Sequence, residues 1–405
     1  MVMTVFDDYP NLFYPASLTR CVGDIRCGIL KLRQRLQAAI FSEENVVVID
    51  PGLESLYKER HPDWIINAVN GDALFVNSRL RYNPSIIQTI SSLQPQQVIR
   101  DEQDQLVALR TVIKEMVHDF AAIEKLASNA EVISVGNVLY NSLADVIMDN
   151  GRLIDSDFRQ FFQDEDNYME TELGVTVLNP YQVWIGEGAM LKPGVVLDAT
   201  HGPVVIDENA EVMAHAVIMG PCYIGKNSKV KVGAKIYENT SIGPVCKIGG
   251  EVEGSIIQAY SNKQHDGFLG HAYLGEWVNL GAGTNNSDLK NNYKNVSFYS
   301  YAPKAKVDST YQFLGSMIGD HSKTGINSTL NTGVVIGMGA NLWGSGLISG
   351  YVPSYTWGEA GSYEKYDFQQ FIQTAKIVKQ RRNLTVTDNE TEVLRQIIIK
   401  EQQEQ

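Results

Sequence analysis

Cysteine is scarce in this sequence: only four of its 405 residues are cysteines, and no two of them form a CxxC pair. They lie far apart, at Cys21, Cys27, Cys222 and Cys246. This spacing matches neither a zinc site nor a disulfide framework, so we expect four reduced thiols in a cytoplasmic protein.

Long apolar runs and an excess of basic charge are also missing. No window holds about 18 apolar residues in a row, and residues 1–10 carry neither a basic nor an apolar stretch, so we expect no membrane span and no signal peptide. The 34 basic residues are outnumbered by 47 acidic ones, which gives a net charge of −13. Because a nucleic-acid reader needs a basic surface, we expect neither nucleic acid nor a membrane as a partner.

The remaining composition is that of a globular protein, and the length suits two or three domains. The character of the chain changes near residue 170. The first part, residues 1–165, mixes strand-like apolar runs with helical periodicity and predicts an α/β domain. The strand-like runs are residues 46–49, 64–66 and 73–76, and the helical pattern covers residues 104–127. The last part, residues 351–405, predicts a helical segment with helices at residues 363–380 and 390–400.

Between these parts an aliphatic residue returns every six positions. Six residues of an α-helix turn through about 600°, so such positions would spiral around it. In a strand every sixth residue returns to the same face. The glycines and asparagines that come after the aliphatic residues are suited to the backbone angles of corners. We therefore expect a parallel β-helix over residues 166–350, with stacked anchors forming one core. The longest run is Ile206, Val212, Ile218, Ile224, Val230, Ile236, Ile242 and Ile248. Other runs are Ile185, Leu191 and Leu197; Leu274 and Leu280; and Ile318, Thr324, Leu330, Ile336 and Leu342.

The six-residue repeat lapses twice, at residues 254–268 and 285–313. A β-helix tolerates loops only outside its prism, where they can reach a neighbouring subunit. We therefore expect both segments to be external loops. The first lapse and the residues after it contain two histidines, His265 and His271, and a Gly-Ala-Gly turn.

The stretch from His265 to Thr284 resembles the acetyltransferase domain of the GlmU family, the bifunctional makers of UDP-N-acetylglucosamine. His265 lies fourteen residues before Asn279, which opens the run Asn-Leu-Gly-Ala-Gly-Thr, as the catalytic histidine does in that family. Residues 18–30 resemble the start of a divergent bacterial branch with a GlmU-like nucleotidyltransferase domain. The resemblance implies an α/β nucleotidyltransferase-like domain, a left-handed parallel β-helix and a helical tail. It also implies a homotrimer whose active sites lie between neighbouring prisms.

For acetyl transfer, the resemblance implies that His265 is the general base. The attacking amine must lose a proton, and a neutral histidine titrates near the operating pH. Asn279 resembles the family's substrate-contacting amide. Backbone N–H groups of the glycine-rich turn would hold acetyl-CoA or the oxyanion; these cofactor-binding candidates are Gly281, Ala282, Gly283 and Thr284. The alternatives are that His265 is an exposed loop histidine without a role, or that His271 is the base.

Other polar residues are weaker candidates. Four of them would bind sugar or phosphate: Lys263, Asn291, Asn292 and Tyr293. The alternative is that they are ordinary polar side chains on the surface. Two positions depart from the family: Glu253 stands where a phosphate-binding lysine is expected, and Phe268 replaces a tyrosine.

The N-terminal domain lacks the G-x-G-T-R-M loop that wraps the triphosphate in sugar nucleotidyltransferases. Arg20 and Arg26, in a basic run that continues through Lys31, Arg33 and Arg35, would contact the nucleotide instead. For the later members of the run, the alternative is an amphipathic helix face. Asp72 would hold Mg²⁺ for nucleotidyl transfer, with a simple turn as the alternative.

The function that fits best is a sugar-phosphate acetyltransferase and nucleotidyltransferase of UDP-N-acetylglucosamine-type synthesis. Its partners would be a sugar phosphate, acetyl-CoA and a nucleoside triphosphate. One alternative is an acyltransferase whose N-terminal domain is not catalytic. Another is a γ-carbonic-anhydrase-type metalloenzyme, with zinc on His265, His271 and either His215 or His321.

Overall fold

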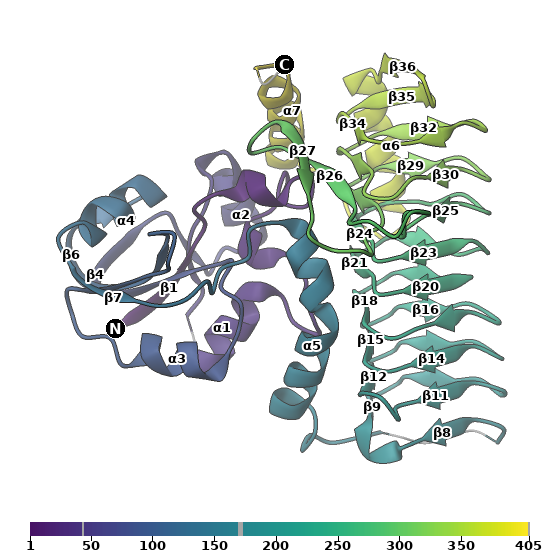
Figure 1. Cartoon of the computed structure of the whole chain (residues 1–405), viewed down its shortest axis with the longest axis horizontal. Helices are drawn as coiled ribbons and strands as arrows, with labels where there is room; N and C mark the ends of the chain where they lie inside the picture. Colours follow the sequence, from purple (N-terminus) through teal and green to yellow (C-terminus); the bar gives the residue numbers. More distant parts are fainter. Residues whose placement is uncertain (43, 169–172, 404–405) are drawn as a thin grey trace.

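The structure is a computed structural model that describes residues 1–42, 44–168 and 173–403. Figure 1 shows an α/β domain at the left beside a tall stack of coils at the right, with the C-terminal helices near the upper end of the stack. Among the described residues, no helix is both long and apolar enough to cross a bilayer.

The N-terminal domain is built on one seven-stranded sheet with the order β3-β2-β1-β4-β6-β5-β7. Strands β1 to β4 are parallel, and β6 runs antiparallel to both of its neighbours. The three predicted strand runs are confirmed as β2, β3 and β4. The strands are β1 Val2–Phe6, β2 Val46–Val48, β3 Ile65–Ile66, β4 Val69–Asn77, β5 Gln97–Arg100, β6 Leu106–Val117 and β7 Glu131–Ser134. The α-helices are α1 Leu32–Ile40, α2 Glu54–Arg60, α3 Pro84–Ser91, α4 Phe120–Ala127 and α5 Leu143–Phe161. The short 3-10 helices are η1 Pro10–Phe13, η2 Val22–Asp24 and η3 Pro51–Leu53.

The predicted helix over residues 104–127 is wrong for most of its length. Residues 106–117 form strand β6, and only α4 is helical. The start of β6 is buried on both faces of the sheet, so its apolar residues do not alternate and imitate a helical pattern. The helix begins only after Asp119, whose side chain accepts a hydrogen bond from the Ala122 N–H at 2.8 Å.

The middle of the chain is a left-handed parallel β-helix, as predicted, and every aliphatic anchor of the six-residue repeat is buried in its core. Each coil passes over three faces. Face 1 is one nine-stranded sheet toward the N-terminal domain: β9 Val183–Ile185, β12 Val204–Ile206, β15 Cys222–Ile224, β18 Thr240–Ile242, β21 Ile256–Ala259, β24 Tyr273–Glu276, β28 Met317–Ile318, β31 Val335–Ile336 and β34 Tyr351–Val352.

The other two faces complete each coil, and the short helix η4 Pro180–Gln182 precedes β9. Face 2 holds β10 Met190–Leu191, β13 Glu211–Val212, β16 Lys229–Val230, β19 Lys247–Ile248, β22 Asn262–Lys263, β29 Lys323–Thr324, β32 Asn341–Trp343 and β35 Thr356–Glu359. Face 3 holds β8 Thr176–Leu178, β11 Val196–Asp198, β14 Val217–Met219, β17 Lys235–Ile236, β20 Glu251–Glu253, β23 Phe268–Gly270, β25 Asn285–Asn286, β30 Thr329–Leu330 and β33 Leu347–Ile348.

The first lapse of the repeat, at residues 254–268, is not an external loop. The strands β21, β22 and β23 continue the stack there, and Lys263 occupies an anchor position opposite Ile248. The pattern seemed to lapse because this anchor is polar and because three neighbouring steps are shorter than six residues, from Ile248 to Val252, from Val252 to Ile257 and from Leu269 to Leu274.

The second lapse does leave the prism. Its hairpin, β26 Ser297–Ser300 and β27 Ala305–Asp308, extends toward the N-terminal domain, and Phe298 and Tyr301 are buried in a core shared with that domain. This loop therefore contacts the N-terminal domain of its own chain.

The end of the chain differs slightly from expectation. The stack continues past residue 350 through β34 and β35, and residues 362–365 form strand β36 Ser362–Lys365 rather than the start of a helix. The two predicted helices are present as α6 Phe368–Gln380 and α7 Asp388–Gln403.

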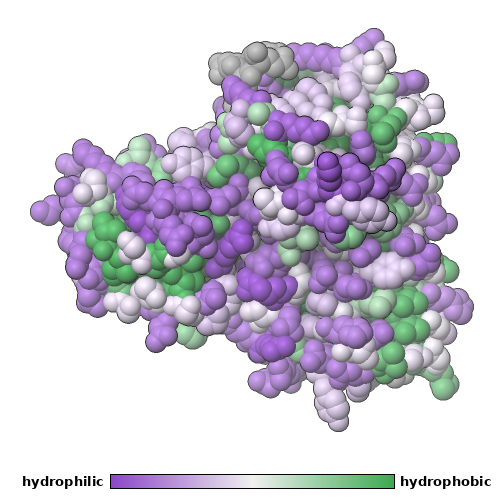
Figure 2. All heavy atoms as spheres, viewed as in Figure 1, coloured by the Kyte–Doolittle hydropathy of each residue, from purple (hydrophilic) through white to green (hydrophobic). Residues whose placement is uncertain are grey.

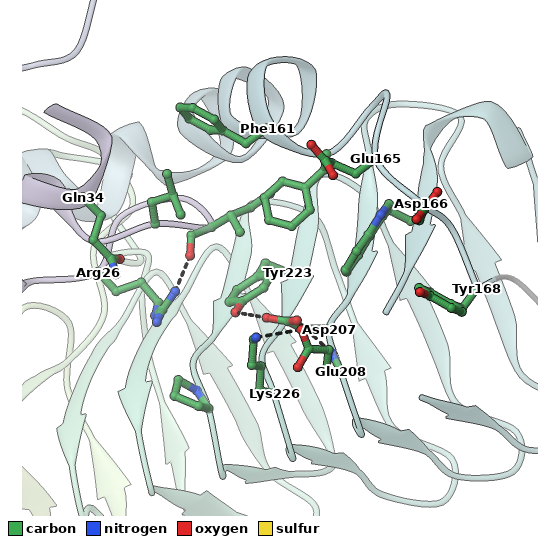
Figure 3. A pocket seen from close by; sticks show the side chains of 15 residues that line it. Arg26, Gln34, Phe161, Glu165, Asp166, Tyr168, Asp207, Glu208, Tyr223 and Lys226 are labelled. Carbon is green, nitrogen blue, oxygen red and sulfur yellow. Dashed lines mark hydrogen bonds and ion pairs between the residues drawn. The ribbon is translucent and has the colours of Figure 1, made fainter. Parts of the chain in front are cut away.

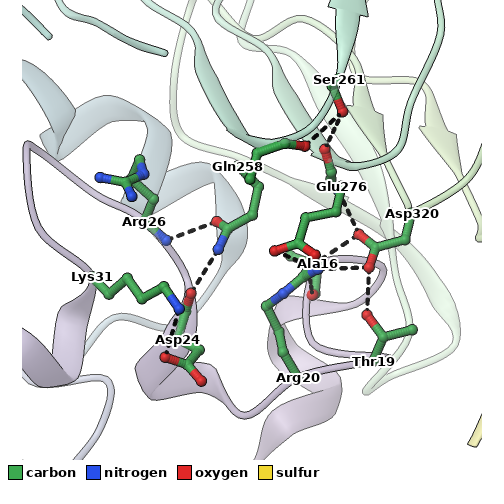
Figure 4. A network of polar contacts seen from close by, with 12 residues as sticks. Ala16, Thr19, Arg20, Asp24, Arg26, Lys31, Gln258, Ser261, Glu276 and Asp320 are labelled. Atoms are coloured by element: carbon green, nitrogen blue, oxygen red, sulfur yellow. Dashed lines mark hydrogen bonds and ion pairs between the residues drawn. The ribbon is translucent and has the colours of Figure 1, made fainter. Parts of the chain in front are cut away.

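A buried ion pair joins the N-terminal domain to the β-helix (Figure 4). Arg20 Nη2 lies 2.6 Å from Asp320 Oδ2, and Thr19 donates to the same oxygen at 2.6 Å. Burial opposes ionisation, but the Arg20 charge holds the pKa of Asp320 below its usual value. Beside this pair, the Gln258 side chain accepts from the Arg26 N–H and donates to the Asp24 carbonyl. The two domains therefore share polar contacts as well as an apolar core.

Arg20→Ala tests this junction. The change leaves the Asp320 carboxylate buried without its partner, so we expect the free energy of unfolding in urea to fall by about 3–5 kcal/mol. The matched control is Arg159→Ala, which breaks an exposed pair with Asp155 and should cost below about 1 kcal/mol. Equal losses in the two variants would contradict the proposed importance of the junction.

Candidate functional site

His265 lies at the corner where the chain passes from β22 on face 2 to β23 on face 3, and it is exposed. The Gly281–Thr284 turn forms the same corner one coil later. The Gly283 N–H donates to the Asp266 carbonyl at 2.9 Å, and the Ala282 carbonyl accepts from the Asn327 N–H of the following coil at 2.7 Å. We call this line of corners the His265 edge. The structure thus brings together the histidine and the glycine-rich turn of the sequence motif.

The glycines of the turn are needed for stacking. A Cβ on Gly281 would collide with the Gly325 carbonyl, and Gly283 has φ +72°. Their N–H groups are also occupied, because Gly281 donates to the Thr324 carbonyl at 3.1 Å and Gly283 donates to Asp266. The Thr284 N–H closes the turn on the Gly281 carbonyl. Within the described part of the chain, the Ala282 N–H is the donor of this turn that has no protein acceptor. Of the predicted backbone donors for acetyl-CoA or the oxyanion, the N–H groups of Gly281, Gly283 and Thr284 are already used within the protein.

Asn279 lines a pocket of about 290 Å³ on face 2 that we call the cationic pocket. Its lining holds four basic side chains and no acidic one: Lys247, Lys323, Arg381 and Arg382. Burial and the nearby Arg382 charge lower the pKa of Lys247, and burial lowers the pKa of Lys323 to about 8. An uncompensated cluster of this kind favours an anion. Gln264, which directly precedes His265, also lines the pocket.

Sequence reasoning missed these four basic residues. Lys247 pairs with Lys229 in neighbouring coils of face 2, eighteen residues apart, and this spacing was a usable signal for a basic column. No signal was available for Arg381 and Arg382. They follow α6, and only the tertiary fold brings the end of that helix to face 2.

Lys263 points into the prism of the β-helix. Its side chain is buried, and Nζ donates to the Gly249 carbonyl at 2.9 Å and to the His265 carbonyl at 2.7 Å. Burial lowers its pKa from 10.5 to about 8. The role of this lysine in the structure is to hold the corner that carries His265.

His271 lies at the other end of β23, at the corner between face 3 and face 1. Its Nδ1 is 2.8 Å from Asp288 Oδ2, and its ring packs on Phe313. A carboxylate on Nδ1 fixes the tautomer and leaves Nε2 as the basic nitrogen, so this pair is a second candidate base. Glu253, whose pKa is raised by burial, lies beside it.

The remaining β-helix candidates lie apart from the His265 edge. Asn291, Asn292 and Tyr293 are exposed on the loop that leaves face 3 after β25. The proposed zinc histidines are not gathered, because His265 and His271 occupy different edges and His321 is buried against Phe371. Nowhere in the described ranges do three His, Cys, Asp or Glu side chains form a group suited to a metal ion.

The basic run of the N-terminal domain is used in ion pairs. Arg20 pairs with Asp320, Arg35 lies 2.6 Å from Asp157, and Lys31 and Arg33 both contact Asp24. Despite burial, these last two cations hold the pKa of Asp24 far below its usual value. The prediction that Arg20 is free to contact a nucleotide was therefore wrong. Arg26 lines a different cavity, described below.

Asp72 does not fit a magnesium site. It lies near the amino end of β4, whereas parallel sheets bind ligands beyond the carboxyl ends of their strands. Its carboxylate faces Arg110 Nη2 at 3.6 Å and the N-terminal amine at 4.0 Å. These two cations face Asp72 Oδ2, whereas Asp72 Oδ1 has no hydrogen-bond partner within the described structure. The position at the amino end of the strand argues against a role for Asp72 in nucleotidyl transfer.

Residues 3–166 match the family model of sugar nucleotidyl transferases. A bifunctional GlmU protein of Synechococcus elongatus is 30% identical over 224 residues, covering 50% of this chain and 45% of that protein. A bifunctional sugar-1-phosphate nucleotidylyltransferase/acetyltransferase of Sulfurisphaera tokodaii is 34% identical over 154 residues, 36% of this chain and 37% of that protein. The chain thus spans less than half the length of these relatives. The solved UDP-N-acetylglucosamine acyltransferase of Francisella novicida is 15% identical with a TM-score of 0.32, covering 57% of this chain and 87% of that one.

Lys263→Met tests the structural role of the buried lysine. The unfolded chain keeps this proton up to pH 10.5, whereas the folded protein releases it near pH 8. Between these values the unfolded state binds more protons, so the stability of the native protein rises with pH. We expect the wild type to gain about 1–3 kcal/mol relative to Lys263→Met between pH 8 and 10 in urea unfolding.

The control for this measurement is Lys229→Met, which removes a surface lysine paired with Glu211 on the same face. Its difference from wild type should stay flat over the same pH range. If the stability difference between wild type and Lys263→Met is also independent of pH, and the variant binds substrate more weakly, Lys263 contacts the substrate instead.

Proposed function

We propose that this chain, a GlmU-like protein, transfers an acetyl group from acetyl-CoA to the amine of an amino-sugar phosphate, with His265 as the general base. Nucleotidyl transfer by the N-terminal domain would complete a UDP-N-acetylglucosamine-type synthesis in the cytoplasm. The observation that carries the acetyltransferase proposal is the stacking of His265 directly against the Gly-Ala-Gly turn, joined by the 2.9 Å hydrogen bond between Gly283 and Asp266.

The chemistry needs a base, an oxyanion donor and a place for phosphate. His265 takes a proton from the amine as its nitrogen bonds to the thioester carbonyl carbon. The carbonyl oxygen then carries negative charge, and the Ala282 N–H is the available donor at this edge. Collapse of the intermediate breaks the carbon–sulfur bond and releases the CoA thiolate.

The cationic pocket supports phosphate-bearing substrates. Asn279 and Gln264 connect it to the corner of His265, so a ligand seated there lies beside the proposed base. Both the sugar phosphate and CoA carry phosphate groups. We therefore assign the pocket to a phosphate of one of these two substrates, with Arg382 and Lys247 as its main contacts.

We also propose a homotrimer. His265 is exposed in the single chain, whereas acyl transfer is protected from hydrolysis when water is excluded. Two apolar side chains flank it on the same edge: Val232 is 66% exposed and Ile326 is 71% exposed. Figure 2 shows hydrophobic atoms at the right-hand side of the β-helix on a mostly hydrophilic surface. A neighbouring prism packed along this edge would cover these side chains and close the site.

One observation favours a second candidate, an acyltransferase whose N-terminal domain only positions substrate or controls assembly. The segment that follows β1, where related enzymes would wrap a triphosphate, is docked on the β-helix through Arg20 and Gln258. The two candidates differ in whether the intact protein releases pyrophosphate from UTP and N-acetylglucosamine-1-phosphate with Mg²⁺ present.

His265→Ala tests the acetyltransferase proposal. The side chain is exposed, so the fold should be kept, while CoA release with glucosamine-1-phosphate should fall by about 10²–10⁴-fold. His215→Ala is the matched control, since His215 is an exposed histidine at an earlier corner of the same edge. It should leave the rate unchanged. A larger loss in His271→Ala than in His265→Ala would assign the base to the His271–Asp288 pair instead.

Introducing lysines at the proposed subunit interface tests the homotrimer. We expect the wild type to sediment as a trimer at micromolar concentration and Val232→Lys with Ile326→Lys to sediment as a monomer with a native circular dichroism spectrum. Burying two unpaired ammonium groups would cost more than the apolar contact contributes. A wild-type monomer that is fully active would refute the trimer.

A further inference from the structure

A cavity at the domain junction has a volume of about 560 Å³. Figure 3 shows the side chains that line it. We call it the junction pocket. It lies between face 1 of the β-helix, the end of α5 and the loop that carries Arg26 and Ile29. Its size is that of a pocket for a small organic ligand. It is on the opposite side of the coil from the His265 edge, and the proposed acetyl transfer does not use it.

Aromatic side chains form the walls of the junction pocket. Trp184 on β9 and Tyr223 on β15 project outward from face 1, and Phe162 packs edge-on against Trp184 with ring centroids 5.1 Å apart. The guanidinium carbon of Arg26 lies 5.2 Å from the centre of the Tyr223 ring. The pocket thus offers flat apolar faces, with a cation at one end.

Two buried donors at this pocket lack partners. Neither Arg26 Nε nor Trp184 Nε1 makes a hydrogen bond within the described structure, although both atoms are buried. Arg26 as a whole is only 7% exposed. A buried donor without an acceptor destabilises the protein, so the site is suited to a ligand that supplies acceptor oxygens.

The charge of the lining excludes a phosphorylated ligand. Arg26 and Lys226 face four carboxylates, Glu165, Asp166, Asp207 and Glu208, which leaves two negative charges in excess. Asp207 accepts from the Tyr223 hydroxyl at 2.8 Å, and Glu208 pairs with Lys226 at 2.8 Å. Glu165 and Asp166 have no ion-pair partner among the described residues, so they are available to a cationic group.

We propose that the junction pocket binds an unphosphorylated amino sugar. The C–H face of a pyranose ring packs on the flat faces of Trp184 and Tyr223, and its hydroxyl and ring oxygens accept from Arg26 Nε and Trp184 Nε1. The ammonium group is placed toward Glu165 and Asp166. Because the walls come from both the N-terminal segment and the β-helix, the bound sugar ties the two domains together. This site is separate from the acetyl-transfer site.

Isothermal titration of the intact protein with glucosamine tests the proposal, with glucose as the uncharged comparison. We expect saturable binding of glucosamine below about 10 mM and at least tenfold weaker binding of glucose. Trp184→Ala should abolish glucosamine binding, and the matched control Trp343→Ala, which removes an outward tryptophan of face 2, should not. The double variant Glu165→Gln, Asp166→Asn should weaken glucosamine about tenfold and leave glucose unchanged.

Acetyl transfer by Trp184→Ala separates this proposal from the proposed function. We expect CoA release from glucosamine-1-phosphate to match wild type, since the junction pocket is remote from the His265 edge. The proposal is overturned if glucosamine shows no saturable heat, if glucose binds equally well, or if Trp184→Ala binds glucosamine as the wild type does. It is also overturned if glucosamine binding is lost in Lys247→Ala, because the ligand would then occupy the cationic pocket.

Discussion

Backbone hydrogen bonding between successive coils is the constraint on which the rest of the structure depends. Each coil must return to register with the one below, so every anchor side chain faces the same core and every corner lies above another corner. The same bonds occupy most N–H groups of the Gly281–Thr284 turn. Stacking therefore explains why glycines are needed at Gly281 and Gly283. It also leaves the Ala282 N–H as the backbone donor of this turn without a protein acceptor in the described structure.

The junction of the two domains is the second organising feature, and it explains the unusual N-terminal segment. The basic run begins in the chain after β1 and continues into α1, and four of its five cations pair with Asp24, Asp157 and Asp320. A segment held by buried ion pairs is fixed in place, since separating any pair leaves an uncompensated charge. The segment that follows β1 is therefore a structural connection between the N-terminal domain and the β-helix.

Three surface regions of the molecule differ in their chemical character. The His265 edge holds an exposed histidine beside a glycine-rich turn, the cationic pocket beside it is lined by four basic side chains, and the junction pocket is aromatic and acidic. The two pockets therefore carry opposite net charge, which favours anions at the cationic pocket and cations at the junction pocket. The edge is built from consecutive coils, whereas each pocket combines segments that lie far apart in the sequence.

The sequence by itself determined the β-helix, its anchors, the two C-terminal helices and the proximity of His265 to the glycine-rich turn. These features are local or periodic, and a six-residue period converts spacing directly into position. The sequence did not reveal that β6 is a strand, because a strand buried on both faces loses its alternation. It also could not show that Lys263 turns inward, that Arg20 is paired with Asp320, or that Arg381 and Arg382 reach face 2. Those outcomes were decided by tertiary structure alone, since a charged side chain takes its role from the groups that packing brings to it.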